Sequence, residues 1–156
     1  MLKLLGALLI ISIGGFAAVT SVRYERRRVS VIDGWIDLIF YIRGQIDCYL
    51  LPIGEILEKG DSYLNTAKLS YEGAANLNAI LEASSIYLDG DVKRLLEGFV
   101  SEIGDCYREE QVRRCEYYMN ALSAQRDKIA ANAPIRIKLS ATLCMCIALG
   151  TSILLW

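Results

Sequence analysis

Three pairs of acidic residues lie close together in the sequence: Asp33/Asp37, Asp89/Asp91 and Glu109/Glu110. Two carboxylates can act as general acid and general base when a cleft separates their pKa values. Acidic residues are also typical of helix caps and solvated helix faces, and we favour these structural roles here. The chain has no histidine, the commonest general base, and neither a GxxxxGK[ST] nor a GxGxxG phosphate loop. The residues therefore predict no catalytic site, no cofactor and no enzyme.

Five cysteines are scattered unevenly along the chain: Cys48, Cys106, Cys115, Cys144 and Cys146. An odd, irregular set is a poor disulfide framework and fits a reducing compartment. Cys144 and Cys146 could form a redox or metal pair, but inside an apolar segment they are more simply small hydrophobic residues. Without histidine or a second pair of cysteines, we expect no metal site.

The sequence has a long uncharged segment near each of its two ends. Leu4 to Val22 contains about 19 uncharged residues, which as a helix would span about 28 Å, close to the ~30 Å apolar thickness of a bilayer. Leu139 to Trp156 is a second uncharged segment of similar length. A helix that is apolar on every face is typical of a lipid environment. The sequence predicts transmembrane helices over residues 1–22 and 139–156.

Basic residues flank both segments on their inner sides: Arg23, Arg26, Arg27, Arg28, Arg136 and Lys138. Such clusters stay on the cytoplasmic side of a membrane, so residues 23–138 are predicted to form a cytoplasmic domain, with both termini outside. A cleaved signal peptide is the alternative for the first segment, but the apolar run is long for one and the arginines follow it directly. Anchoring against anionic lipid explains the arginine cluster more simply than binding to an acidic protein face.

The interior predicts only helices. Apolar residues recur every three or four positions over residues 30–49, 52–59, 71–87, 92–103 and 105–136, and no segment alternates with period two. The result is an all-α bundle of about four to six helices. With 17 basic and 18 acidic residues, the chain has no basic surplus to suggest nucleic acid. Its nine tyrosines fit either an interface or half-buried core positions.

Several helix ends can also be predicted. Ser30 with Asp33 resembles a capping box, although the helix could equally continue from the membrane without a break. Asp91 is a good N-cap for the helix over 92–103, and Pro134 is expected to kink the last helix or mark a short break in it.

The opening MLKLLGALLI, followed by arginines, resembles the start of the stage III sporulation protein AB family of endospore-forming Firmicutes. Gln45-Ile46, Tyr49 and Pro52 to Leu57 are similar to that family's EI-x-x-x-x-[TP]-L-x-E-A/I pattern, with Gln45 in place of the usual Glu. Phe99, Ile103-Gly104 and Glu110-Gln111 resemble its later F-x-x-x-L-G…Q segment. The last apolar segment has Leu139-Ser140 where Leu-Gly is usual, and residues 61–87 are shorter and divergent.

This resemblance implies a non-enzymatic component of the secretion-like channel between mother cell and forespore. The family's cytoplasmic domain looks like that of the platform proteins of type II secretion and type IV pilus machines. By that analogy the protein would lie in the mother-cell membrane around the forespore, against a cytoplasmic sporulation ATPase and sister membrane subunits. A generic bacterial membrane adaptor and a small membrane enzyme remain alternatives. Oligomeric state is left open.

Overall fold

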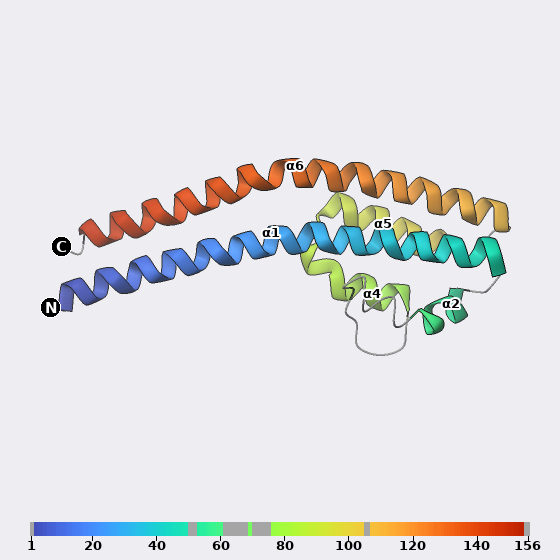
Figure 1. Cartoon of the computed structure of the whole chain (residues 1–156), viewed down its shortest axis with the longest axis horizontal. Coiled ribbons are helices and arrows are strands. Elements are labelled where there is room, and N and C mark those ends of the chain that lie inside the picture. The colour runs from blue at the N-terminus through green and yellow to red at the C-terminus, as the bar shows by residue number, and fades with distance from the viewer. Residues whose placement is uncertain (1, 50–52, 61–68, 70–75, 105–106, 155–156) are drawn as a thin grey trace. The chain divides into compact units, whose positions relative to one another are not determined.

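The chain is mainly helical in the part that the computed structural model describes, residues 2–49, 53–60, 69, 76–104 and 107–154. The described residues form five α-helices and one short 3-10 helix: α1 (Leu2–Tyr49), α2 (Ile53–Lys59), α4 (Leu77–Ser84), η1 (Ser85–Tyr87), α5 (Gly90–Glu102) and α6 (Arg108–Leu154). The α-helices are labelled in Figure 1. No strand occurs in these residues. The prediction of an all-α fold is confirmed.

The chain divides into two compact units. Met1–Arg27 and Ile129–Trp156 form one, which we call the two-helix unit, and Arg28–Lys128 forms the other, which we call the bundle unit. The long helices α1 and α6 each contribute to both units. The predicted boundaries, at residues 22/23 and 138/139, stay predictions.

One face of α1 forms much of the core of the bundle unit. Its buried apolar residues recur at helical spacing: Val31, Ile32, Trp35, Leu38, Ile39, Ile42 and Ile46. Trp35 has no exposed surface, and its indole Nε1 donates a hydrogen bond to Ser84 Oγ over 3.1 Å. The helix runs through Ser30 without a break, so of the two alternatives, a capping box at Ser30 or a continuous helix, the structure has the continuous helix.

Helix α4 begins at Leu77. Asn76 has an extended backbone and its side chain accepts a hydrogen bond from the backbone N–H of Asn78, so the helix starts at Leu77. The predicted start at Tyr71 lies outside the described residues. The apolar positions Ile80 and Leu81 are buried as expected.

Helix α5 starts earlier than predicted, and Asp91 is not its N-cap. The N-cap is Asp89, whose side chain makes no capping hydrogen bond. Its carboxylate instead forms an ion pair with Arg28, which accounts for the missing cap, while Asp91 lies within the first turn. The C-terminal end of α5 is followed by Gly104, whose φ of 107° favours glycine.

Helix α6 continues through Pro134, so the predicted break does not occur there, and the alternative of a kink stays a prediction. Toward its N-terminal end, Cys115 and Leu122 are buried, as expected for two of the apolar positions that recur over residues 105–136, and Tyr118 is buried beside them. The Tyr118 ring meets Phe99 of α5 edge to face at 5.5 Å. A Cβ on Gly98 would lie 2.9 Å from the Tyr118 hydroxyl, so the glycine permits this close approach of α5 to the ring.

Candidate functional site

Three ion pairs join α1 to α6 within the bundle unit. Asp33 accepts a hydrogen bond from Arg126 Nε over 2.9 Å, Arg43 pairs with Glu116 at 2.6 Å, and Asp47 pairs with Arg108 at 2.8 Å. Each step along α1 is matched by a step backward along α6, so the two helices are antiparallel. The hydrogen bond with Asp33 raises the pKa of Arg126.

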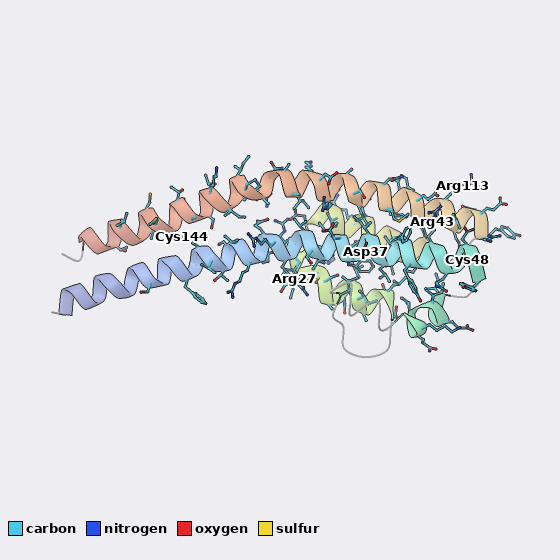
Figure 2. The ribbon with its side chains drawn as sticks, in the orientation of Figure 1. Arg27, Asp37, Arg43, Cys48, Arg113 and Cys144 are labelled. Carbon is cyan, nitrogen blue, oxygen red and sulfur yellow. The ribbon has the colours of Figure 1, made fainter. Side chains whose placement is uncertain are left out.

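Asp33 is therefore paired with an arginine of another helix, whereas Asp37 on the same helix is exposed (Figure 2). Asp89 of the second acidic pair is occupied by Arg28. The structure thus assigns one member of each of these pairs to holding helices together. The sequence favoured helix caps and solvated faces for these residues, and it did not predict these ion pairs between helices.

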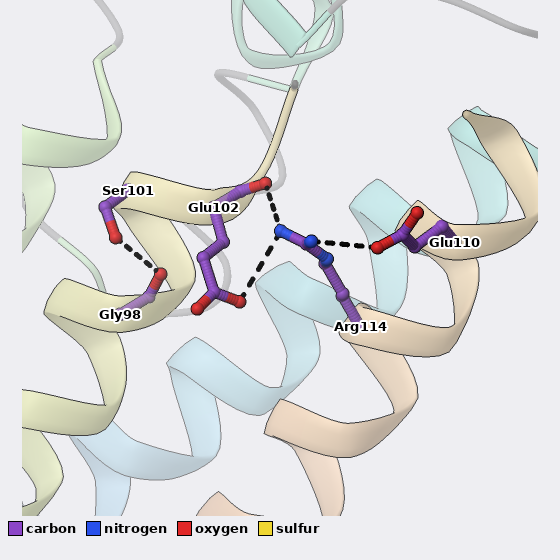
Figure 3. A network of polar contacts seen from close by, with 5 residues as sticks. All are labelled: Gly98, Ser101, Glu102, Glu110 and Arg114. Carbon is purple, nitrogen blue, oxygen red and sulfur yellow. Dashed lines mark hydrogen bonds and ion pairs between the residues drawn. The ribbon is translucent and has the colours of Figure 1, made fainter. Parts of the chain in front are cut away.

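A single arginine links α5 to α6 (Figure 3). Arg114 Nη1 donates to the backbone carbonyl of Glu102 at 3.0 Å and lies 3.6 Å from its carboxylate. Arg114 Nη2 donates to Glu110 at 2.9 Å, one turn away on α6. The guanidinium therefore satisfies a carbonyl at the C-terminal end of α5, where cations are favoured.

Arg28 lies in a different unit from Arg23, Arg26 and Arg27, the arginines that precede it. It belongs to the bundle unit, its side chain is only 4% exposed, and it is paired with Asp89. Its position in the sequence suggested a membrane-flanking role, but the structure gives it a packing role within the bundle.

The other predicted flanking residues all belong to the two-helix unit. Four of them are exposed and one, Arg27, is half-buried; the exposed ones are Arg23, Arg26, Arg136 and Lys138. Ser140 Oγ donates a hydrogen bond to Ser21 Oγ over 3.1 Å, which fixes the register of α6 against α1 in this unit. The two helices are antiparallel, and Arg23 follows Ser21 by two residues while Lys138 precedes Ser140 by two. Arg23 and Lys138 therefore lie at the same level along the two helices.

Large apolar side chains on the two-helix unit are exposed: Phe16, Val19, Ile135, Leu139, Leu143, Met145, Ile147 and Leu149. The described residues include one helix, Arg108–Thr151, that by length and composition is apolar enough to cross a membrane, and none of its apolar window is buried. For the first predicted span, the structure gives a helix, but most side chains before Gly15 lie outside the described residues.

Hydroxyl groups along these helices are internally satisfied. Thr20, Thr142 and Thr151 each have a hydroxyl within 2.8 Å of the carbonyl four residues earlier, and Ser21 has one at 3.1 Å. Each of these hydroxyls donates a hydrogen bond to a carbonyl of its own helix. A hydroxyl bonded in this way can face lipid without an unsatisfied donor.

The bundle unit carries exposed aromatic residues that sequence analysis did not distinguish from core positions: Phe40 (60% exposed), Tyr49, Tyr107 (90% exposed) and Tyr117. Among the tyrosines, Tyr118 is buried and the pKa of its hydroxyl is raised, first by burial and then by a hydrogen bond with Glu102. A groove of about 510 Å³ lies between α2, the start of α4 and the end of α5, lined in part by Leu57, Leu77 and Val100.

The cysteines lie in different environments. Cys48 and Cys146 are exposed, Cys144 is half-buried, and burial raises the pKa of the Cys115 thiol to about 11. Cys106 lies outside the described residues. Over the described part of the chain, no three His, Cys, Asp or Glu side chains are grouped so that they could hold a metal ion.

No protein-family model, no curated protein and no solved structure matches this chain.

Proposed function

We propose that this protein is a non-enzymatic, membrane-anchored assembly component whose helical bundle binds other proteins at the membrane surface. The observation that carries the proposal is the contrast between its two units. The two-helix unit exposes large apolar residues such as Leu139 and Leu143, whereas the bundle unit buries most of its aliphatic residues in a core that includes Trp35. Lipid is the solvent that suits the first surface, and water suits the second.

The proposed topology places both helices of the two-helix unit across the membrane and the bundle unit in the cytoplasm. The basic residues at the inner ends of the apolar segments support this side, because lysine and arginine are enriched in cytoplasmic flanks. The exposed aromatic residues Phe40, Tyr107 and Tyr117 supply a surface of the kind that is enriched at protein interfaces.

The specific role that we propose is that of a stage III sporulation protein AB-like platform. It would act in the mother-cell membrane around the forespore, bind a cytoplasmic sporulation ATPase, and help assemble sister membrane subunits of the channel. The support for this role is the resemblance of the N-terminal segment and of the region around Pro52 to that family, together with the all-α bundle.

The test is an affinity purification of the detergent-solubilised full chain from sporulating cells. The expected result is co-purification of a sporulation ATPase or a sister membrane subunit with the wild type, and loss of that partner from a Phe40→Ser/Tyr117→Ser variant. An Asp37→Asn variant, changed at an exposed site without an aromatic group, is the matched control. Purification of the chain without either partner would contradict the platform role.

A generic bacterial membrane adaptor is the second candidate, because the exposed aromatic residues fit any protein partner equally well. A gene neighbourhood without sporulation genes, with an unrelated protein in the purification, would favour it.

A further inference from the structure

Charge is divided unequally between the two units. The two-helix unit contains six basic residues and one acidic residue, a net charge of +5, while the bundle unit contains 11 basic and 17 acidic residues, a net charge of −6. The whole chain has a net charge of only −1, so its composition conceals this division. The positive charge of the two-helix unit is concentrated near the inner ends of its apolar segments, apart from Lys3.

We propose that Arg23, Arg26, Arg136 and Lys138, here called the basic collar, bind the headgroups of anionic phospholipids. All four are exposed, two come from α1 and two from α6. The hydrogen bond between Ser21 and Ser140 sets the register that brings the two pairs together along the same stretch of the two-helix unit. This inference rests on the proposed membrane insertion of that unit.

The position of the collar fits a lipid headgroup. On one side of it lie the exposed apolar residues Phe16, Val19, Leu139 and Leu143, which would contact acyl chains. Lysine and arginine beside an apolar segment extend toward the phosphate level, and each is worth about a fivefold gain in association with an anionic surface. Tyr24, 43% exposed within the same stretch, is a residue type enriched at that level.

Arg28 does not belong to the basic collar. Arg26, Arg27 and Arg28 are adjacent in sequence, but Arg28 is buried in the bundle unit against Asp89. Arg26 and Arg28 are therefore predicted to behave differently, although each removal changes the charge equally. Removal of Arg26 should weaken lipid binding and spare folding, whereas removal of Arg28 should do the reverse.

The experiment is native mass spectrometry of the detergent-solubilised full chain with equimolar phosphatidylglycerol and phosphatidylcholine. The wild type should retain phosphatidylglycerol preferentially. An Arg26→Gln/Arg136→Gln variant should lose that preference by about 25-fold, which is about fivefold for each of the two charges removed. An Arg94→Gln/Arg113→Gln variant removes the same charge from exposed sites of the bundle unit and should retain the wild-type preference. Arg28→Gln should also retain it, with a lower thermal unfolding temperature.

Equal retention of the two lipids by the wild type would overturn the proposal, and it is the result expected if the collar binds an acidic protein instead. Equal loss in the collar variant and in the Arg94/Arg113 control would also overturn it, because net charge alone would then explain the preference. Carbonate extraction of membranes separates this inference from the proposed function. A chain that stays in the membrane without a lipid preference contradicts only the collar, whereas a chain released by carbonate contradicts membrane insertion itself.

Discussion

Residues of the same type have different roles in this chain, and their surroundings decide which. Cys48 is exposed at the end of α1, whereas Cys115 is fully buried against the bundle core. Gly44 lies in open space within α1, whereas Gly104 has a backbone that side-chain-bearing residues rarely adopt. Each contrast supplies a matched pair of sites for experiment.

The buried thiol predicts a loss of stability at alkaline pH. The pKa of Cys115 is raised from 9.0 to about 11, so the folded state favours the neutral thiol. Its contribution is fully present below pH 9 and is lost as the pH rises toward 11. The raised pKa of Tyr118 acts in the same direction. Chemical denaturation of the wild type between pH 8 and 11 should show this decline, and Cys115→Ala should flatten it; an equally steep decline in the variant would contradict the assignment.

The two glycines predict opposite effects of alanine. Gly104→Ala should destabilise the protein by about 1–3 kcal/mol, because alanine at positive φ is strained. Gly44→Ala should stabilise it by up to about 1 kcal/mol, because alanine is the better helix former and the added methyl meets no atom within 4 Å. Thermal unfolding of both variants in one detergent measures the difference. Equal shifts for the two would show that the backbone at Gly104 is not the cause.

At the scale of the elements, burial holds the helices together and ion pairs set their register. The pairs between α1 and α6 are partly exposed, and such pairs contribute about 0–1 kcal/mol each. Trp35, in contrast, has no exposed surface and donates its hydrogen bond within the core. The stability of the bundle should therefore depend far more on Trp35 than on Arg126.

A comparison of two variants tests this difference. Trp35→Ala should destabilise the bundle by about 3–5 kcal/mol through the cavity that it leaves. Arg126→Gln should cost no more than about 1 kcal/mol, because it breaks a partly exposed pair with Asp33. Urea denaturation followed by circular dichroism measures both. A larger loss for Arg126→Gln would show that the ion pairs dominate.

The elements also show how far sequence could predict this structure. The apolar face of α1 can be predicted because its residues repeat at helical spacing, and the same holds for the buried positions Cys115 and Leu122 of α6. The start of α5 cannot be predicted in this way, because Asp91 is as good a local cap as Asp89 and only the distant Arg28 distinguishes them. Exposure of Phe40 and the link from Arg114 to Glu102 likewise depend on contacts between helices, which spacing along one helix does not reveal.

At the scale of the whole molecule, one chain combines a two-helix unit of net charge +5 with a bundle unit of net charge −6. An apolar surface beside exposed basic residues is suited to an anionic membrane, whereas an acidic bundle is repelled by one. We infer that this division favours a bundle directed toward cytoplasmic partners. The basic flanks and apolar segments were evident from the sequence, but their alignment through Ser21 and Ser140 required the structure.

Membrane insertion predicts sensitivity to charge on the two-helix unit. Leu143→Arg should reduce the carbonate-resistant fraction, because a basic residue within a membrane helix is unfavourable, by up to about 2.5–3.5 kcal/mol at the centre of the span. Tyr117→Arg, an equally exposed apolar-to-basic change on the bundle unit, should leave that fraction unchanged. Equal behaviour of the two variants in membrane fractionation would argue against lipid contact at Leu143.

The most direct test of the central claim, a membrane-inserted two-helix unit with a cytoplasmic bundle, is thiol labelling of intact cells. Cys48 is the suitable probe because it is exposed, whereas buried Cys115 would not react on either side. In a variant that keeps only Cys48, an impermeant maleimide should label the protein after the cells are opened and not before, and the protein should remain in the carbonate-resistant membrane fraction. Labelling of Cys48 in intact cells, or release of the protein by carbonate, would contradict the claim.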